Sequence, residues 1–213
     1  MKTVRFCYVR HGETLFNKLD RMQGWCDSPL TEKGIRDAQD ARDILKDVHL
    51  DYAWISTSER CRDTCEIVLE GRDIPVFPCK GLKEINFGTF EAVIQHENKE
   101  ELDRRRPLVD WEDAGGDSYE TLRTRLIDTY NSIYEKAADG DTILIVSHGG
   151  TWIWLQKFLF NITQESFFRA KIKKGVSPLP NGYNGIFCCQ DGRWKMLKVR
   201  DLTDEEVREL YGE

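Results

Sequence analysis

Residues 142–151 read TILIVSHGGT, and this stretch decides the fold class. Its first five residues are nearly all apolar and mostly β-branched, which is typical of a strand buried on both faces of a parallel sheet. The chain then passes through Ser147, His148 and two glycines into a helix predicted from about Thr151. Because the first turn of a helix has free N–H groups, a strand that runs directly into a helix predicts an anion-binding site.

Two other predicted strands are also followed directly by candidate site residues. Residues 4–9 form a β-rich run that ends in Arg10-His11-Gly12, and the short apolar run 52–56 precedes a helix predicted over 59–69, with Arg60 in its first turn. We also predict helices over 31–45, from Asp117 with Glu120 as a capping box, and over 203–210, and strands over 74–77, 186–189 and 194–199. This alternation predicts an α/β fold: a three-layer αβα domain with a mostly parallel central sheet.

Residues 91–116 depart from the alternation of strands and helices, because they are polar and charged and contain no clear strand. They are predicted to form a cap-like, partly helical insertion over the active site, although a charged excursion of this kind also fits a solvated surface segment. No linker or internal repeat divides the chain, so residues 1–213 are predicted to form a single domain.

Composition narrows the function classes. The 31 Lys and Arg residues against 37 Asp and Glu residues give a net charge of −6, which argues against a nucleic-acid binder and against adhesion to anionic membranes. No apolar run approaches the length of a membrane helix, and Arg5 interrupts the start where a signal peptide needs apolar residues. We therefore expect a cytoplasmic protein whose seven cysteines are reduced and mostly buried.

Four motifs carry chemistry. His11 is a candidate nucleophile beside the planar guanidinium of Arg10. His148 stands at a predicted strand end, and Arg60 lies in the first turn of a helix that follows one. Glu84 follows a weak strand among apolar neighbours, where partial burial would raise its pKa and suit it to proton transfer. Taken singly, each motif also fits a structural role: a core histidine, an exposed helix arginine or an ordinary loop acid.

Together the motifs resemble the histidine phosphatase superfamily, also called the phosphoglycerate mutase-like family. The resemblance rests on their order, which runs from Arg10-His11-Gly12 and Asn17 through G24-W-x-D-S-P-L-T-x-x-G34, S56-x-x-x-R60-x-x-x-T64 and L82-x-E84-x-x-F-G88 to Ser147-His148-Gly149. It covers residues 4 to about 200.

The resemblance implies a metal-free phosphoryl transfer with no cofactor. His11 would be transiently phosphorylated, while Arg10, Arg60 and His148 would hold the transferring group. Glu84 would protonate the leaving oxygen and then activate water. The implied substrate is a small phosphorylated metabolite, with no nucleic-acid or membrane partner and with a homodimer left open. Further contacts to the substrate are expected from Asn17, Arg21, Gly149, Arg104 and Arg105, although the Arg104–Arg106 triplet also has Glu100, Glu101 and Asp103 as local partners.

Within the family, Ser-Thr-Ser-x-Arg at 56–60 and the short chain resemble the broad-specificity phosphatase branch. Cofactor-dependent phosphoglycerate mutases usually carry a longer basic insertion and tail, whereas residues 201–213 here are acidic. A phosphoglycerate mutase is the alternative, since it shares the intermediate and returns the phosphoryl group to a substrate hydroxyl. A non-catalytic phospho-ligand-binding relative is disfavoured because His11 and Glu84 are both present. Two departures from the family pattern stand out. Ala92 takes the place of a common glycine, and Trp152 and Trp154 replace smaller residues, for which we expect a packing role.

Overall fold

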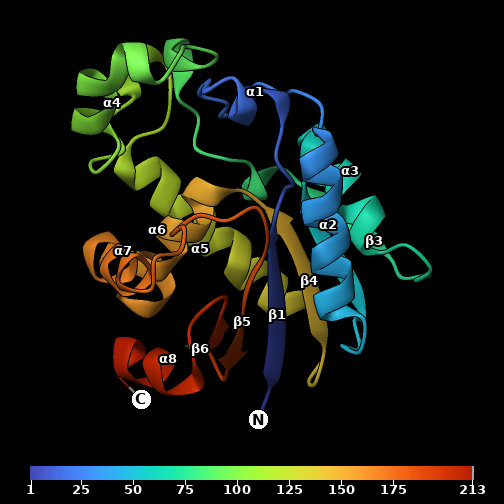
Figure 1. Cartoon of the computed structure of the whole chain (residues 1–213). Coiled ribbons are helices and arrows are strands. Elements are labelled where there is room, and N and C mark those ends of the chain that lie inside the picture. Colours follow the sequence, from blue (N-terminus) through green and yellow to red (C-terminus); the bar gives the residue numbers. More distant parts are fainter. Residues whose placement is uncertain (213) are drawn as a thin grey trace.

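The computed structural model of the protein, described here for residues 1–212, has a six-stranded sheet at its centre (Figure 1). The strand order is β3-β2-β4-β1-β5-β6. Within it, β1 pairs in parallel with β4, β4 with β2 and β2 with β3, while β5 is antiparallel to both of its neighbours. Five strands therefore point the same way, which confirms the mostly parallel sheet. The strands span Thr3–Arg10 (β1), Tyr52–Ser56 (β2), Val76–Cys79 (β3), Thr142–Ser147 (β4), Gly182–Gln190 (β5) and Arg193–Val199 (β6).

Helices cover both faces of the sheet, as expected for three layers. Figure 1 shows α2 (Glu32–Leu45) and α3 (Glu59–Val68) on one side of β1 and β4, with α5 (Tyr119–Lys136) and α6 (Gly149–Phe160) on the other. Alternate residues of β1 enter two separate cores: Phe6 and Tyr8 join the α5–α6 core, whereas Cys7 and Val9 join the α2–α3 core. Short helices α1 (Leu15–Lys18), α4 (Lys99–Arg105), α7 (Gln164–Lys173) and α8 (Asp204–Tyr211) complete the chain.

Most predicted elements are present, with shifts at their ends. The hairpin of β5 and β6 and the Thr203–Glu206 capping box of α8 are confirmed. The weak strand lies two residues later than predicted, at 76–79 instead of 74–77. Helix α5 is capped by Ser118 and Thr121 and not by Asp117. Asp117 instead accepts the N–H of Asn86 and forms an ion pair with Arg125.

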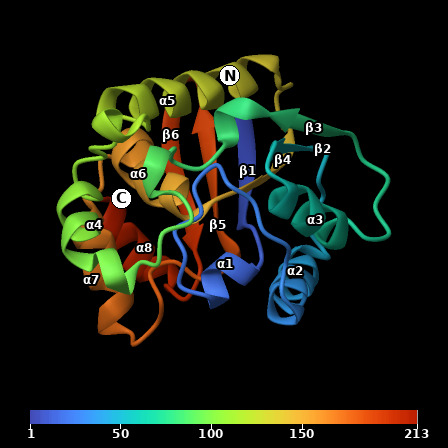
Figure 2. The same cartoon turned by 90° about the horizontal axis from the view of Figure 1, so that it is seen from above.

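The insertion at residues 91–116 is partly helical, as predicted, and lies at the end of the molecule where β1 ends (Figure 1). It contains α4 and two 3-10 turns, at His96–Asn98 and Glu112–Ala114. Backbone pairing fastens it to the body, because Met22 donates to the carbonyl of Val93 and Ala92 donates to the carbonyl of Met22. Ala92 has a φ of +65°, a left-handed conformation that favours glycine. In the view from above (Figure 2), α4, α6 and α7 gather on one side of this end of the molecule.

Two smaller predictions also have outcomes. Within residues 1–212, none of the helices combines the length and the apolar character that crossing a bilayer requires. Five of the seven cysteines are buried, as predicted: Cys7, Cys61, Cys65, Cys188 and Cys189.

Candidate active site

The carboxyl ends of β1 and β4 bring two histidines together. Arg10, the last residue of β1, is in register with Ser147, the last residue of β4, and the N–H of His11 donates to the Ser147 carbonyl at 3.0 Å. The rings of His11 and His148 are therefore neighbours, with centroids 5.3 Å apart and planes inclined at 63°. The parallel sheet thus joins two motifs that stand more than 130 residues apart in the sequence.

His11 is held as a neutral imidazole. The side chain is buried, and its Nδ1 lies 2.9 Å from the carbonyl of Gly12. A carbonyl only accepts hydrogen bonds, so Nδ1 carries the proton and Nε2 keeps the lone pair. Burial, together with the positive charges of Arg60 and Arg10, lowers the pKa of His11 well below its usual 6.5. At neutral pH, the ring has the protonation state of a nucleophile.

Arg60 is the most heavily bonded side chain of the site. It is 1% exposed. Its Nη1 donates to the carbonyl of Cys26 and to the carboxylate of Asp27, each at 2.9 Å. Its Nη2 donates to the carbonyl of Gly24 at 2.8 Å and to Nδ1 of His148 at 2.9 Å. These bonds fix the orientation of the guanidinium before any ligand binds.

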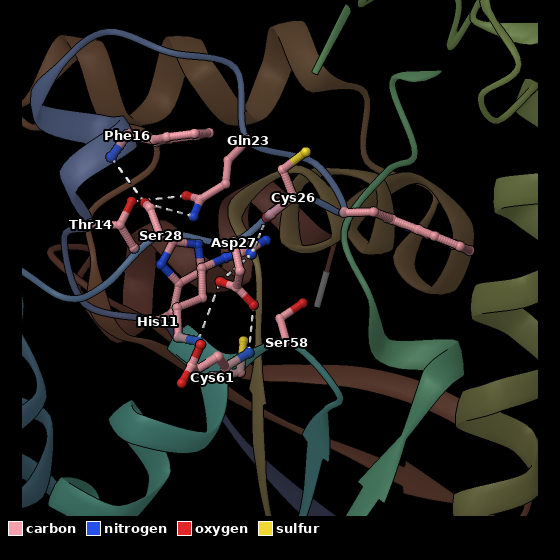
Figure 3. A network of polar contacts seen from close by, with 12 residues as sticks. His11, Thr14, Phe16, Gln23, Cys26, Asp27, Ser28, Ser58 and Cys61 are labelled. Atoms are coloured by element: carbon pink, nitrogen blue, oxygen red, sulfur yellow. Dashed lines mark hydrogen bonds and ion pairs between the residues drawn. The ribbon is translucent and has the colours of Figure 1, made fainter. Parts of the chain in front are cut away.

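Asp27 holds Arg60 from two directions. Besides the ion pair, its carboxylate accepts the backbone N–H groups of Glu59 and of Arg60 itself. Asp27 therefore caps α3, whose own N-cap residue, Ser58, makes no side-chain cap bond. Figure 3 shows Asp27 beside the start of this helix, with Ser58 and Cys61 nearby. One carboxylate thus orients both the helix and the arginine that the helix carries.

His148 lies beneath the cavity instead of on its surface. Its side chain is fully buried, with Nδ1 accepting from Arg60 and Nε2 2.7 Å from the hydroxyl of Ser56. Burial and the neighbouring positive charge of Arg60 lower the pKa of His148 well below 6.5. In this arrangement His148 supports Arg60, and direct contact of His148 with a phosphoryl group stays a prediction.

Arg10 and Arg60 each keep one buried donor without a partner. Nη1 of Arg10 donates to the carbonyl of Leu179 at 2.5 Å. The Nε atoms of Arg10 and Arg60 have no hydrogen-bond partner within residues 1–212, although both are buried. A buried cationic donor without a partner is costly in an isolated protein, so two of them beside one imidazole indicate a site for an anion.

Glu84 sits at the N-terminus of α6. One carboxylate oxygen accepts the N–H of Gly150 at 2.9 Å, and the other accepts those of Thr151 at 3.0 Å and of Ile85 at 2.9 Å. Its backbone carbonyl accepts from Nε1 of Trp25. The residue Glu84 is 9% exposed, so its predicted partial burial is confirmed.

These groups line a cavity of about 530 Å³. Among the predicted site residues, Arg10, His11, Asn17, Arg21, Arg60 and Glu84 all contribute to its wall. The cavity is large enough for a phosphate and for a leaving group of considerable size.

Two predicted contacts, Arg104 and Arg105, lie outside the cavity wall. Arg104 is exposed on α4 and pairs with Glu101. Arg105 is turned away from the cavity, pairs with Glu101 and Asp113, and stacks over the ring of Phe90 at 4.9 Å. Arg106, the third of the triplet, lines the cavity instead.

Gly149 does not line the cavity either. It lies against Arg10, where an added Cβ would come within 3.0 Å of Nε. Its role is to leave room for that guanidinium, and the neighbouring Gly150 forms part of the wall.

Comparison with known proteins identifies the family of this chain. Residues 6–201 match the model of the histidine phosphatase superfamily (branch 1). The chain belongs to the histidine phosphatase superfamily. It is 32% identical to the adenosylcobalamin/alpha-ribazole phosphatase of Salmonella typhimurium over 81% of this chain and 87% of that one. It is 30% identical to a 2,3-bisphosphoglycerate-dependent phosphoglycerate mutase of Cytophaga hutchinsonii, over 80% of this chain and 84% of the mutase.

A solved structure supports the same family. The crystal structure of phosphoglycerate mutase from Bacillus anthracis superposes with a TM-score of 0.79 and 28% identity, covering 98% of this chain and 96% of that one. The expected family and fold are therefore both confirmed.

Several residues of this histidine phosphatase site were not predicted individually. Gln23 lines the cavity and is fixed by Thr14 and Ser28, a network that continues to the backbone of Phe16 (Figure 3). Glu91 accepts the N–H groups of Trp25 and Cys26 and so holds the loop that binds Arg60. Leu179 and Phe168 also line the cavity. Tertiary packing brings them there, and nothing in the sequence around them predicts this position.

The two tryptophans after His148 differ in their surroundings. Trp152 packs in the core against Tyr8, with ring centroids 4.6 Å apart, as predicted. Trp154 is 6% exposed, stacks on Phe158 and also lines the cavity, so for this residue packing is only part of the role.

The groups at the floor of the cavity are guanidinium and imidazole side chains, which attract anions. Among residues 1–212, no three His, Cys, Asp or Glu side chains are grouped so that they could hold a metal ion. Whether activity depends on a metal stays a prediction for experiment.

Proposed function

We propose that this histidine phosphatase hydrolyses small phosphomonoesters through a phosphohistidine on His11. The observation that carries the proposal is the pair of buried, unpartnered Nε donors of Arg10 and Arg60 next to a neutral His11. Phosphoryl transfer needs preorganised positive donors around the equatorial oxygens, and these two arginines supply them.

The reaction has two steps. Nε2 of His11 attacks phosphorus, the bond to the ester oxygen breaks, and that oxygen takes the proton of the Glu84 carboxyl group. Water then gives a proton to the Glu84 carboxylate as its oxygen attacks phosphorus. The P–N bond breaks, and inorganic phosphate leaves a regenerated imidazole. Arg10 and Arg60 bear the charge of the transferring group in both steps.

The mutase is the alternative function. In that case a hydroxyl of a second substrate molecule, and not water, would take the phosphoryl group from His11. Named relatives carry both activities, and no observation on this chain favours the mutase. We further propose a small phosphorylated metabolite as substrate, a cytoplasmic location, no nucleic-acid or membrane partner, no cofactor and an insertion that caps one single domain; a homodimer is compatible with these features.

The test combines two variants with a phosphometabolite panel. His11→Ala should abolish turnover of every substrate and leave no phosphoenzyme. Glu84→Gln should accumulate an acid-labile phosphohistidine, since it keeps the nucleophile but lacks the base for hydrolysis. His49→Ala, at a histidine whose side chain is 83% exposed outside the cavity, is the control for a general histidine effect.

Mass spectrometry after an acid-free quench detects the intermediate, and a phosphoglycerate mutase assay runs beside the panel. Full activity of His11→Ala would refute the proposal. Faster mutase turnover than hydrolysis would favour the alternative.

A further inference from the structure

One arginine of α5 fastens the loop that carries the proposed acid. The Arg125 side chain is 17% exposed, and its Nη1 donates to the carbonyls of Lys83 at 2.6 Å and of Gly81 at 3.2 Å. Its Nη2 donates to the carbonyl of Glu84 at 3.1 Å. Three backbone carbonyls between residues 81 and 84 are therefore held by a single guanidinium group.

Asp117 holds this guanidinium and the far side of the same loop. Its carboxylate accepts from Nη2 of Arg125 at 2.6 Å and from the N–H of Asn86 at 3.0 Å. The N–H of Asp117 in turn donates to the carbonyl of Asn86 at 2.8 Å. A planar guanidinium, whose N–H groups point in fixed directions, suits such a set of acceptors better than the ammonium group of a lysine. The pair therefore fixes the loop on both sides of Glu84.

The two ends of Glu84 are held by different parts of the fold. Its carbonyl accepts from Arg125 and, at 2.8 Å, from Nε1 of Trp25. Its carboxylate accepts the N–H groups of Gly150 and Thr151 at the start of α6. Because these N–H groups belong to α6 and not to the loop, the carboxylate meets them only when the backbone of Glu84 is correctly placed.

Arg125 lies outside the phosphoryl site. Within residues 1–212 it is not part of the cavity wall, so it does not reach a bound substrate. The bonds that orient Arg60 come from residues 24–27 and from His148, and none of them involves Arg125. Loss of Arg125 would therefore release the loop of Glu84 while the donors for the phosphoryl group stay in place.

Resting on the proposed function, in which Glu84 is the acid and the base, we propose that Arg125 is a positioning residue for Glu84. Arg125 sets the backbone from which the carboxyl group reaches the ester oxygen and then the attacking water. A change at Arg125 impairs the proton transfers of both steps. It has little effect on the attack of His11 on an ester whose leaving group needs no proton.

The test separates the two steps of the reaction with two esters. kcat/KM reports the steps up to release of the alcohol, and kcat also includes hydrolysis of the phosphohistidine. Arg125→Met removes every donor but keeps a long side chain. It should lower kcat/KM for ethyl phosphate by ~10–100-fold, the loss expected when a reacting group is displaced by about 1 Å.

The aryl ester 4-nitrophenyl phosphate should respond differently. Its kcat/KM should fall less in Arg125→Met, because its acidic leaving group needs little help from a proton donor. Its kcat should still fall, and phosphohistidine should accumulate, because activation of water also uses Glu84. Inhibition by inorganic phosphate should be unchanged, since Arg10 and Arg60 stay in place, whereas a general loss of structure would weaken it.

The same helix offers a matched control. Arg123 has a side chain that is 48% exposed and pairs with Glu120 at 3.8 Å, so Arg123→Met should leave the activity on both esters unchanged. Arg125→Lys should restore part of the activity on ethyl phosphate, because an ammonium group can still bind some of the carbonyls. Arg125→Met combined with Glu84→Gln should cost little beyond Glu84→Gln alone, because both changes act on one group.

The outcomes distinguish this proposal from the proposed function. Equal losses of kcat/KM on both esters, with weaker inhibition by phosphate, would overturn the positioning role and leave Arg125 a purely structural one. Full activity of folded Arg125→Met on ethyl phosphate would overturn it as well. If that variant does not fold, Asp117→Asn takes its place, because its amide oxygen still accepts from Asn86 while its hold on Arg125 weakens; an unchanged ratio between the two esters then overturns the proposal. Full activity of His11→Ala, or no hydrolysis of either ester by the parent protein, contradicts the phosphatase function itself.

Discussion

Substitution of Gly150 by alanine should displace the proposed acid without removing it. A Cβ at this position would lie 2.6 Å from the nearer oxygen of Glu84 and 3.1 Å from its carboxyl carbon. Ordinary van der Waals contact begins near 3.4 Å, so the carboxyl group must move by ~0.8 Å. The N–H of Gly150 is also one of the three donors that hold this carboxylate.

The magnitude follows from that displacement. A misplacement of ~1 Å at a reacting group can cost on the order of 10²-fold in rate, so we expect kcat/KM for alkyl phosphates to fall by ~10–100-fold. That range corresponds to ~1.4–2.7 kcal/mol of transition-state stabilisation. Stability should not fall in parallel, because the groups that the new Cβ would crowd, the Glu84 carboxyl group and Cδ1 of Ile85, are the ends of side chains that can move. The variant should therefore be folded, with a melting temperature near that of the parent, and slow.

The assay compares an alkyl phosphate with an activated aryl phosphate, whose acidic leaving group needs less help from a proton donor. Gly150→Ala should lose more on the alkyl ester. When combined with Glu84→Gln it should cost little beyond Glu84→Gln alone, since both changes act on one group. Lys157→Ala, further along α6, controls for a general effect on the helix. Full activity of a folded Gly150→Ala variant on alkyl phosphates would refute the assignment of Glu84 as the acid.

Three further predictions concern pH, the insertion and metals. Burial and nearby arginines lower the pKa values of His11 and His148 well below 6.5, so below about pH 6.5 the unfolded chain binds protons that the folded chain does not. The free energy of unfolding should then fall as pH decreases, by up to ~1.4 kcal/mol per pH unit for each histidine. When this free energy is measured by urea unfolding at several pH values, it should change less steeply with pH in His11→Asn than in His49→Asn. The same dependence on pH in both variants would contradict the stated burial effect. Arg105→Ala should lower the melting temperature by about 2–4 °C while Arg104→Ala leaves it nearly unchanged, because only Arg105 stacks on the aromatic residues of the insertion; equal shifts would rule out that distinction. Exhaustive treatment with a chelator should leave phosphatase activity intact, and a loss restored only by a divalent ion would show that the predicted metal independence is wrong.

Local sequence predicted those elements whose signals lie within a few residues. The apolar run 142–146 and the glycines after His148 indicate a buried strand entering a helix, and the structure has β4 and α6 there. Where two local signals compete, the prediction is weaker. Asp117 and Ser118 are both good N-cap residues, and Ser118 caps α5 because Arg125, two turns along the helix, engages Asp117.

The arginine triplet shows why the wall of the cavity was harder to predict. Consecutive residues of a helix point in directions about 100° apart, so the three arginines cannot all face the same way. Arg106 lines the cavity together with Asp103, three positions earlier. Which of the three arginines faces the cavity depends on how the insertion docks, through backbone pairing between residues 20–22 and 92–95. Helix α7 was not predicted, and its contribution to the wall arises from packing beside α6.

The sequence by itself determined the family, the layered α/β fold and the identity of the groups proposed for catalysis, because those signals are short runs of residues at the ends of strands. Only the tertiary structure decided how these groups are held. Arg60 is fixed by carbonyls and a carboxylate from residues 24–27 and by His148, segments that are distant along the chain. Such bonds depend on the order of strands in the sheet and on the position of each loop. They therefore leave no periodicity or spacing in the sequence from which they can be predicted.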